Sequence, residues 1–169
     1  GGGTSGGGTS GGGTSNGGHD SAQFAGTTGK QEGKSTATGK SQLIDARVGG
    51  HDGFDRAVFE FEGKGVPAYT LEYIKKPLTH CSSGEEVKVG GGAVLRVRFS
   101  SSAAHAEDGS SRLKSRDFSP GLSIIKQATL LCDFEGSVEW VLGVGAAHPY
   151  RVMVYQDPAR LVVDIKHQP

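Results

Sequence analysis

The sequence predicts an all-β domain behind a disordered, flexible N-terminal tether, and three observations lead to this prediction. Residues 1–40 form a Gly/Ser/Thr-rich segment in which GGGTS occurs three times without change. Beyond it, short stretches of alternating apolar and polar residues recur, as half-buried strands require. The clearest of them lie in residues 137–165, which contain the only Trp and the only Met. We therefore expect a low-complexity linker over residues 1–40 and one folded domain over residues 41–169.

Composition limits the classes of partner. Lys and Arg together number 18, as do Asp and Glu, so the formal net charge is zero. Proteins that bind nucleic acid usually show a basic excess or a clustered basic face, and this sequence indicates neither. No apolar run reaches about 18 residues, so no transmembrane segment is predicted. The sequence begins without Met or a signal peptide, as expected of a mature or trimmed chain.

Short strands follow one another along the expected domain. Among the early ones, residues 54–62 are the clearest, because Ala57, Phe59 and Phe61 share one face while Glu60 lies on the other. This alternation indicates one buried face and one face in water. Turns marked by Gly and Pro separate the stretches. We expect strands over residues 42–48, 54–62, 69–73, 86–89, 93–99, 129–135, 138–144, 150–154 and 161–165.

Two stretches leave more than one interpretation open. Arg96 and Arg98 alternate with apolar residues and face outward, either as a ligand-facing pair or as a solvated sheet face, which is favoured. Residues 100–120 lack apolar periodicity and predict a long surface loop with a short helical turn near residues 103–107. Such loops are often functional or mobile, and the Ser, Gly and Asp content favours mobility. Residues 124–129 fit either a strand or a short helix.

The two cysteines, Cys81 and Cys132, both lie inside the expected domain. They are either two buried thiols or one disulfide that closes a long loop, and the disulfide is slightly favoured. A disulfide would place the protein outside the cytoplasm.

No pattern in the sequence indicates a metal site or a catalytic centre. None of the six His lies two or four positions from another, so no metal site is predicted. Residues 29–35 resemble a phosphate-binding loop, but the spacing is one residue short and no apolar strand precedes them. No particular pair of carboxylates stands out as a hydrolytic pair. We therefore expect neither an enzyme nor a cofactor.

Two segments together resemble the AMIN-like domain of actinobacterial secreted proteins and lipoproteins. The first is ARVGGHDGFDRAVFEF at residues 46–61, and the second joins PYRVMV at 149–154 to PARLVVDI at 158–165. The shared pattern is an early D-R-x-V-F-x-F strand and a late P-x-R-L-V-V-D-I strand. That domain is similar in turn to the AMIN module found beside cell-wall amidases and pilus secretins. The resemblance covers about residues 43–167.

The resemblance implies a small β-sandwich of two packed sheets without a catalytic centre. It further implies a non-enzymatic binding or targeting module of the cell envelope, secreted or lipid-anchored and therefore extracytoplasmic. Peptidoglycan or another envelope component, a cell-wall glycan or an envelope protein, is the expected partner. The alternative is an extracytoplasmic carrier for a small ligand or lipid, with a cavity between the sheets. We expect a monomer.

The candidate ligand-binding residues are four residues at a Gly-rich turn and the single Trp. A core position is the favoured interpretation for the aromatic members, although the indole has glycines nearby that would allow partial exposure. The Arg of this set is expected to pair with its neighbour, Asp55, and to fix the start of the strand. The candidates are His51, Asp52, Phe54, Arg56 and Trp140.

Overall fold

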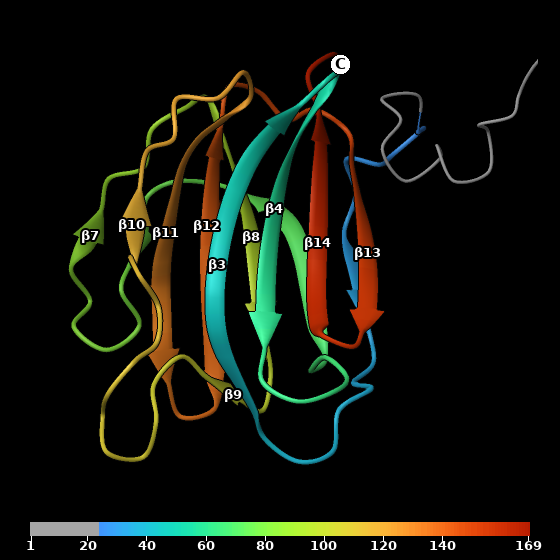
Figure 1. Cartoon of the computed structure of the whole chain (residues 1–169). Helices are drawn as coiled ribbons and strands as arrows, with labels where there is room; N and C mark the ends of the chain where they lie inside the picture. The colour runs from blue at the N-terminus through green and yellow to red at the C-terminus, as the bar shows by residue number, and fades with distance from the viewer. Residues whose placement is uncertain (1–23) are drawn as a thin grey trace, which may run out of the picture.

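Two β-sheets packed face to face form a β-sandwich in the computed structural model, which describes residues 24–169 (Figure 1). The described residues contain strands and loops but no helix, so the all-β prediction is confirmed. Residues 1–23 of the predicted linker lie outside this part of the chain. The strands are β2 (Gln31–Gly33), β3 (Ser41–His51), β4 (Phe54–Phe61), β5 (Tyr69–Ile74), β6 (Leu78–Thr79), β7 (Glu86–Val87), β8 (Ala93–Phe99), β9 (Ser102–Ala103), β10 (Asp117–Phe118), β11 (Ile125–Phe134), β12 (Ser137–Val144), β13 (Tyr150–Gln156) and β14 (Ala159–Lys166).

The last four strands are divided between the two sheets: β11 and β12 belong to one sheet, and β13 and β14 belong to the other. The six-stranded sheet runs β10-β11-β12-β8-β5-β2, and the five-stranded sheet runs β13-β14-β4-β3-β9. Neighbours within both sheets are antiparallel except β3 and β9. The early strand β4 therefore pairs with the last strand, β14, with Phe59 aligned to Leu161. This pairing brings the two segments that resemble the AMIN-like domain side by side.

Large apolar side chains fill the space between the sheets, because alternate residues of the long strands point inward. Phe59 and Phe61 on β4 and Phe99 on β8 are buried, as the alternation predicts. The ring centroid of Phe59 lies 5.7 Å from that of Trp140 and 5.6 Å from that of Phe99. Trp140 is fully buried, which confirms the favoured core position and excludes the alternative of a partly exposed indole. Such rings interlock across both sheets and leave the interior filled.

Asp55 joins the two sheets through hydrogen bonds. Its Oδ2 accepts the backbone N–H groups of Ile124 at 2.7 Å and Ile125 at 3.0 Å, and its Oδ1 lies 2.8 Å from Nε2 of His167. Asp55 lies on β4 and Ile125 begins β11, so one buried carboxylate connects the five-stranded sheet to the six-stranded sheet. The predicted pairing of Asp55 with Arg56 is therefore wrong.

Residues 24–40 form an ordered edge of the sandwich, although composition places them in the linker. Thr27 and Tyr150 exchange two backbone hydrogen bonds of 2.9 Å, and β2 pairs with β5. The hydroxyl of Tyr150 donates to the carbonyl group of Gly29, and the carbonyl oxygen of Leu71 lies 3.2 Å from the same hydroxyl. Figure 1 shows this blue segment beside β13. The linker prediction is thus wrong for residues 24–40, because backbone hydrogen bonds hold a polar segment that has few apolar side chains to bury.

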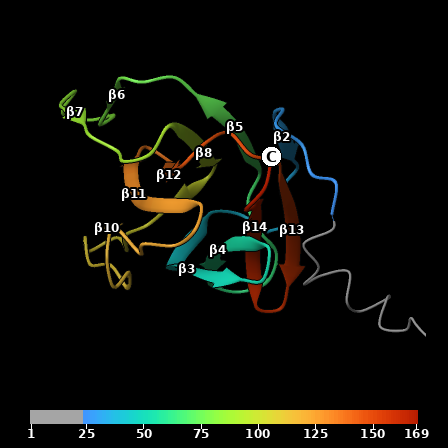
Figure 2. The ribbon, with the colours of Figure 1, turned by 90° about the horizontal axis from the view of Figure 1, so that it is seen from above.

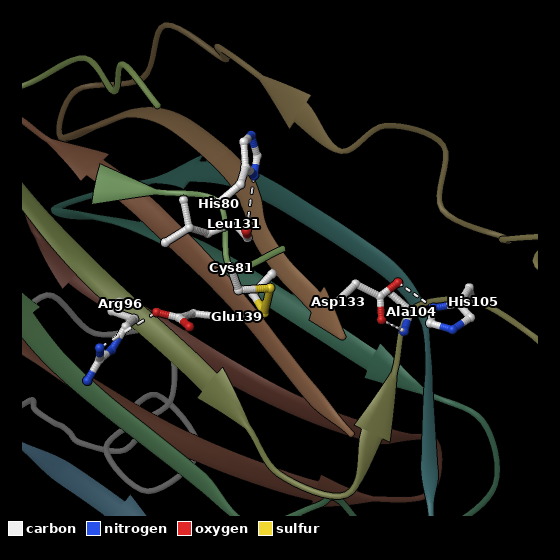
Figure 3. The surroundings of a disulfide bond; sticks show 9 residues. His80, Cys81, Arg96, Ala104, His105, Leu131, Asp133 and Glu139 are labelled. Carbon is white, nitrogen blue, oxygen red and sulfur yellow. Dashed lines mark hydrogen bonds and ion pairs between the residues drawn. A yellow bond between two sulfur atoms is a disulfide. The ribbon is translucent and has the colours of Figure 1, made fainter. Parts of the chain in front are cut away.

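The segment 100–120 covers the opposite side of the sandwich and includes β9 and β10 instead of the predicted helical turn. Its Phe118 packs edge-on against Trp140, with 6.2 Å between ring centroids. His105 Nδ1 lies 2.7 Å from one carboxylate oxygen of Asp133, and the other oxygen accepts the N–H of Ala104 (Figure 3). After this segment, β11 begins at Ile125. Residues 125–129 therefore form part of a strand and not a short helix, which settles the choice left open for residues 124–129.

A disulfide between Cys81 and Cys132 attaches a small lobe to the six-stranded sheet, as predicted. The lobe contains the two-stranded β6–β7 sheet and projects to one side of the sandwich (Figure 2). Figure 3 shows His80 beside the disulfide, with its Nδ1 at 3.1 Å from the carbonyl oxygen of Leu131. Beneath the lobe lies a second apolar cluster, separate from the main core. Its buried members are Leu78, Val89, Val94, Leu131 and Val141.

Candidate functional site

A polar cluster lies on the outer face of the five-stranded sheet, at the end where β3 turns into β4. Arg56 on β4 and Arg151 on β13 are the register partners of Asp164 on β14, one from each side. Ala57, the residue after Arg56 on β4, belongs to the core. By alternation, the side chain of Arg56 therefore points away from the core. We call the residues gathered here the Arg–Asp cluster. Its members are Phe24, His51, Phe54, Arg56, Arg151, Asp164 and Lys166.

Two arginines hold one carboxylate at the centre of the Arg–Asp cluster. Arg56 donates from Nε at 2.7 Å and from a terminal nitrogen at 3.0 Å, and Arg151 donates from Nε at 2.9 Å to Asp164. The side chain of Asp164 is 0% exposed, against 20% for Arg56 and 16% for Arg151. A carboxylate removed from water in this way requires such charge-assisted hydrogen bonds. The pairing fixes both guanidinium groups at the surface of the sheet.

Aromatic rings form the floor and one wall of the Arg–Asp cluster. Phe54 lies on the outer face yet is fully buried, because neighbouring side chains cover it. The guanidinium carbons of Arg56 and Arg151 lie 5.4 and 5.6 Å from its ring centroid. The ring of His51 stacks on it at 4.9 Å, with 4° between the planes, and Phe24 meets it edge-on at 6.1 Å. The cluster therefore combines cations with aromatic faces, which attract one another.

The structure brings together only part of the predicted ligand-binding set. His51, Phe54 and Arg56 belong to the Arg–Asp cluster, and Asp52 is exposed in the adjoining turn. Trp140 lies apart from them, fully buried on the inner side of the opposite sheet. It therefore cannot contact a ligand on the outer face of β4, which corrects its place among the candidates.

Sequence reasoning missed most of the cluster's remaining members. Alternation in RVMVY and RLVVDI places Arg151 and Asp164 on the polar face of their strands. That these residues meet Arg56, however, depends on the pairing order β13-β14-β4, which no local pattern reveals. Phe24 carries no strand pattern at all and lies inside the predicted linker.

The same outer face continues along β13 and β14 as a second group of half-buried side chains. The guanidinium carbon of Arg160 lies 4.7 Å from the ring centroid of Tyr155, whose hydroxyl lies 3.7 Å from the sulfur of Met153. Val58 lies on the same face of β4 and is half-buried. We call these four residues the Tyr155 platform. Its flat ring, cation and apolar groups suit contact with a broad ligand.

The chemistry of this face is that of binding. Cations, one neutralised carboxylate and aromatic rings can hold an anionic or planar group through charge and stacking. Among residues 24–169, no three or more His, Cys, Asp or Glu gather as metal ligands. In the same part of the chain, no helix is long and apolar enough to cross a membrane.

Comparison with known proteins identifies one family. A sequence model described as the AMIN-like domain matches residues 41–167. The match includes every member of the Arg–Asp cluster except Phe24, and all of the Tyr155 platform. No curated protein and no solved structure matches the chain.

Proposed function

The chain belongs to the AMIN-like domain family, which is associated with the cell envelope, and we propose that it is a non-enzymatic module that binds peptidoglycan. In this proposal the outer face of the five-stranded sheet is the binding surface. The Arg–Asp cluster and the Tyr155 platform supply the contacts. The module acts outside the cytoplasm, secreted or lipid-anchored.

One observation carries the proposal: cations and aromatic rings gather on a face that does not contribute to the core. Arg151 and Arg160 each lie over an aromatic ring, at 4.1 Å and 4.7 Å from the ring centroids. Peptidoglycan presents sugar rings together with carboxylates, and arginine and aromatic side chains complement both groups. The disulfide between Cys81 and Cys132 supports the proposed location, because disulfides persist in oxidising compartments.

The filled interior supports a binding surface over a carrier. Trp140, Phe59 and Phe99 pack against one another between the sheets. The best-defined hollows lie on the described surface and open to solvent; one of about 200 Å³ lies beside Lys40 and His105. A carrier needs an enclosed apolar cavity, and the core residues surround none of these hollows.

Sedimentation with purified, protein-free cell walls tests the proposal. We expect the wild-type domain to sediment with the walls and Arg160→Gln to weaken retention about tenfold, since a lost charge-assisted contact is worth about 1.5 kcal/mol. Arg98→Gln is the matched control, because Arg98 is exposed on the other sheet, on β8. The proposal would be overturned if the wild-type domain were not retained by the walls, or if Arg160→Gln and Arg98→Gln were retained equally.

A further inference from the structure

Phe24 covers the charged end of the Arg–Asp cluster. Its ring centroid lies 4.1 Å from the guanidinium carbon of Arg151 and 5.7 Å from Nζ of Lys166. The ring also packs edge-on against Phe54. A half-buried apolar ring thus occupies the place directly in front of two cations.

This place suits an anion better than it suits a phenyl ring. A half-exposed cation–π contact is weaker than a hydrogen bond between charged groups. Within residues 24–169, the ammonium group of Lys166 forms no ion pair, although it lies beside the ring of Phe24. A carboxylate in the position of Phe24 would therefore gain a charged partner there.

The attachment of Phe24 to the sandwich is local. Among residues 24–169, the backbone link nearest to Phe24 is the isolated bridge between Thr27 and Tyr150, and the chain turns at Gly26, whose φ is +69°. A Cβ at Gly26 would lie 2.9 Å from Cβ of Pro149, so the turn needs glycine here. Because β2 is a separate pairing, the bridge can open and release Phe24 while the rest of the edge stays in place.

We propose that Phe24 occupies a subsite for a carboxylate of the envelope ligand and must leave when that ligand binds. The inference rests on the proposed function and adds that the side chain of Phe24 competes with the ligand for this subsite. In the bound state the carboxylate lies between Arg151 and Lys166. The carboxylate has two possible sources in peptidoglycan: the acidic amino sugar itself or the stem peptide.

The test compares Phe24→Ala with the wild-type domain by calorimetric titration of two probes. One probe is the peptide-free disaccharide that contains N-acetylmuramic acid, and the other is the free stem peptide. Removal of the competing ring should tighten binding of the carboxylate source about threefold to tenfold, and the probe that responds identifies that source. Phe134→Ala is the matched control, because Phe134 is 49% exposed at the β11–β12 turn and should leave both affinities unchanged.

Amide exchange of Thr27 and a variant of Lys166 test the subsite in two further ways. In the free wild-type domain the amide proton of Thr27 should exchange slowly, and binding of the responding probe should speed its exchange. Lys166→Gln should remove the gain produced by Phe24→Ala. Unchanged or weaker binding of both probes by Phe24→Ala would overturn the subsite, even if the wild-type domain sediments with cell walls. Failure of that sedimentation overturns the proposed function instead.

Discussion

Asp55 and Asp164 are both buried carboxylates, yet they lie on opposite faces of the same sheet. Asp55 points inward and joins the sheets, and Asp164 points outward and orients two arginines. Alternation along the strand predicts that Arg56 faces outward, and this excludes a pair with Asp55, because adjacent residues of a strand point to opposite faces. Arg56 pairs instead with Asp164, which is 108 positions away. Sequence reasoning can therefore assign a side chain to a face, but its partner depends on strand order.

Replacement of Asp55 tests its role as the link between the sheets. Asp55→Ala should lower the free energy of unfolding by about 3 kcal/mol, because it leaves the N–H groups of Ile124 and Ile125 buried without an acceptor. Asp55→Asn keeps one acceptor oxygen and should lose less. Urea unfolding followed by the fluorescence of the buried Trp140 measures both values. A loss below about 1 kcal/mol for the alanine variant would contradict the role.

Tyr150 should make the domain sensitive to alkali. Burial, with a smaller effect of the Glu72 charge, raises the pKa of Tyr150 to about 12, above the value of about 10 expected in an unfolded chain. The contribution of its neutral hydroxyl is complete below about pH 10 and is lost as the pH rises toward 12. We expect the free energy of unfolding to fall across this window, and to fall less steeply in Tyr150→Phe. Tyr155→Phe, on the outer face, is the control; equal slopes in all three proteins would contradict the assignment.

At the level of elements, the long strands could be predicted, but the short strands and the segments at the edges of the sheets could not. Each predicted stretch of strong alternation coincides with a strand, from β4 to β14. Residues 24–40 escape such reasoning because they attach through backbone hydrogen bonds at the edges of β13 and β5. In the lobe, β7 lies within the predicted strand over residues 86–89, whereas β6 was not predicted; a disulfide and a small separate apolar cluster hold the lobe in place.

Gly143 tests how closely the lobe packs on β12. A Cβ at this position would lie 2.1 Å from the carbonyl oxygen of Gly90 and 2.6 Å from Cγ1 of Val89. Gly143→Ala should therefore displace the lobe and lower the free energy of unfolding by about 1–3 kcal/mol. Gly49→Ala is the matched control, since a Cβ on this β3 residue meets nothing within 4 Å. Equal stabilities of the two variants in urea unfolding would show that the lobe does not pack closely on β12.

At the level of the whole molecule, the fold could be predicted, but the position of the proposed binding face could not. Periodicity predicts the strands, and the resemblance to the AMIN-like domain adds two packed sheets. The Arg–Asp cluster combines residues from β3, β4, β13, β14 and the segment before β2, so it exists only once these elements are in register.

The most direct test of the account is a titration of the ¹⁵N-labelled domain with soluble peptidoglycan fragments, followed by NMR. The account predicts that the largest amide shifts fall on β13, β14 and the start of β4, around Arg151, Arg160 and Asp164. The face of the other sheet around Arg98 should stay unchanged. Shifts concentrated around Arg98, or no shifts at millimolar fragment concentrations, would contradict it.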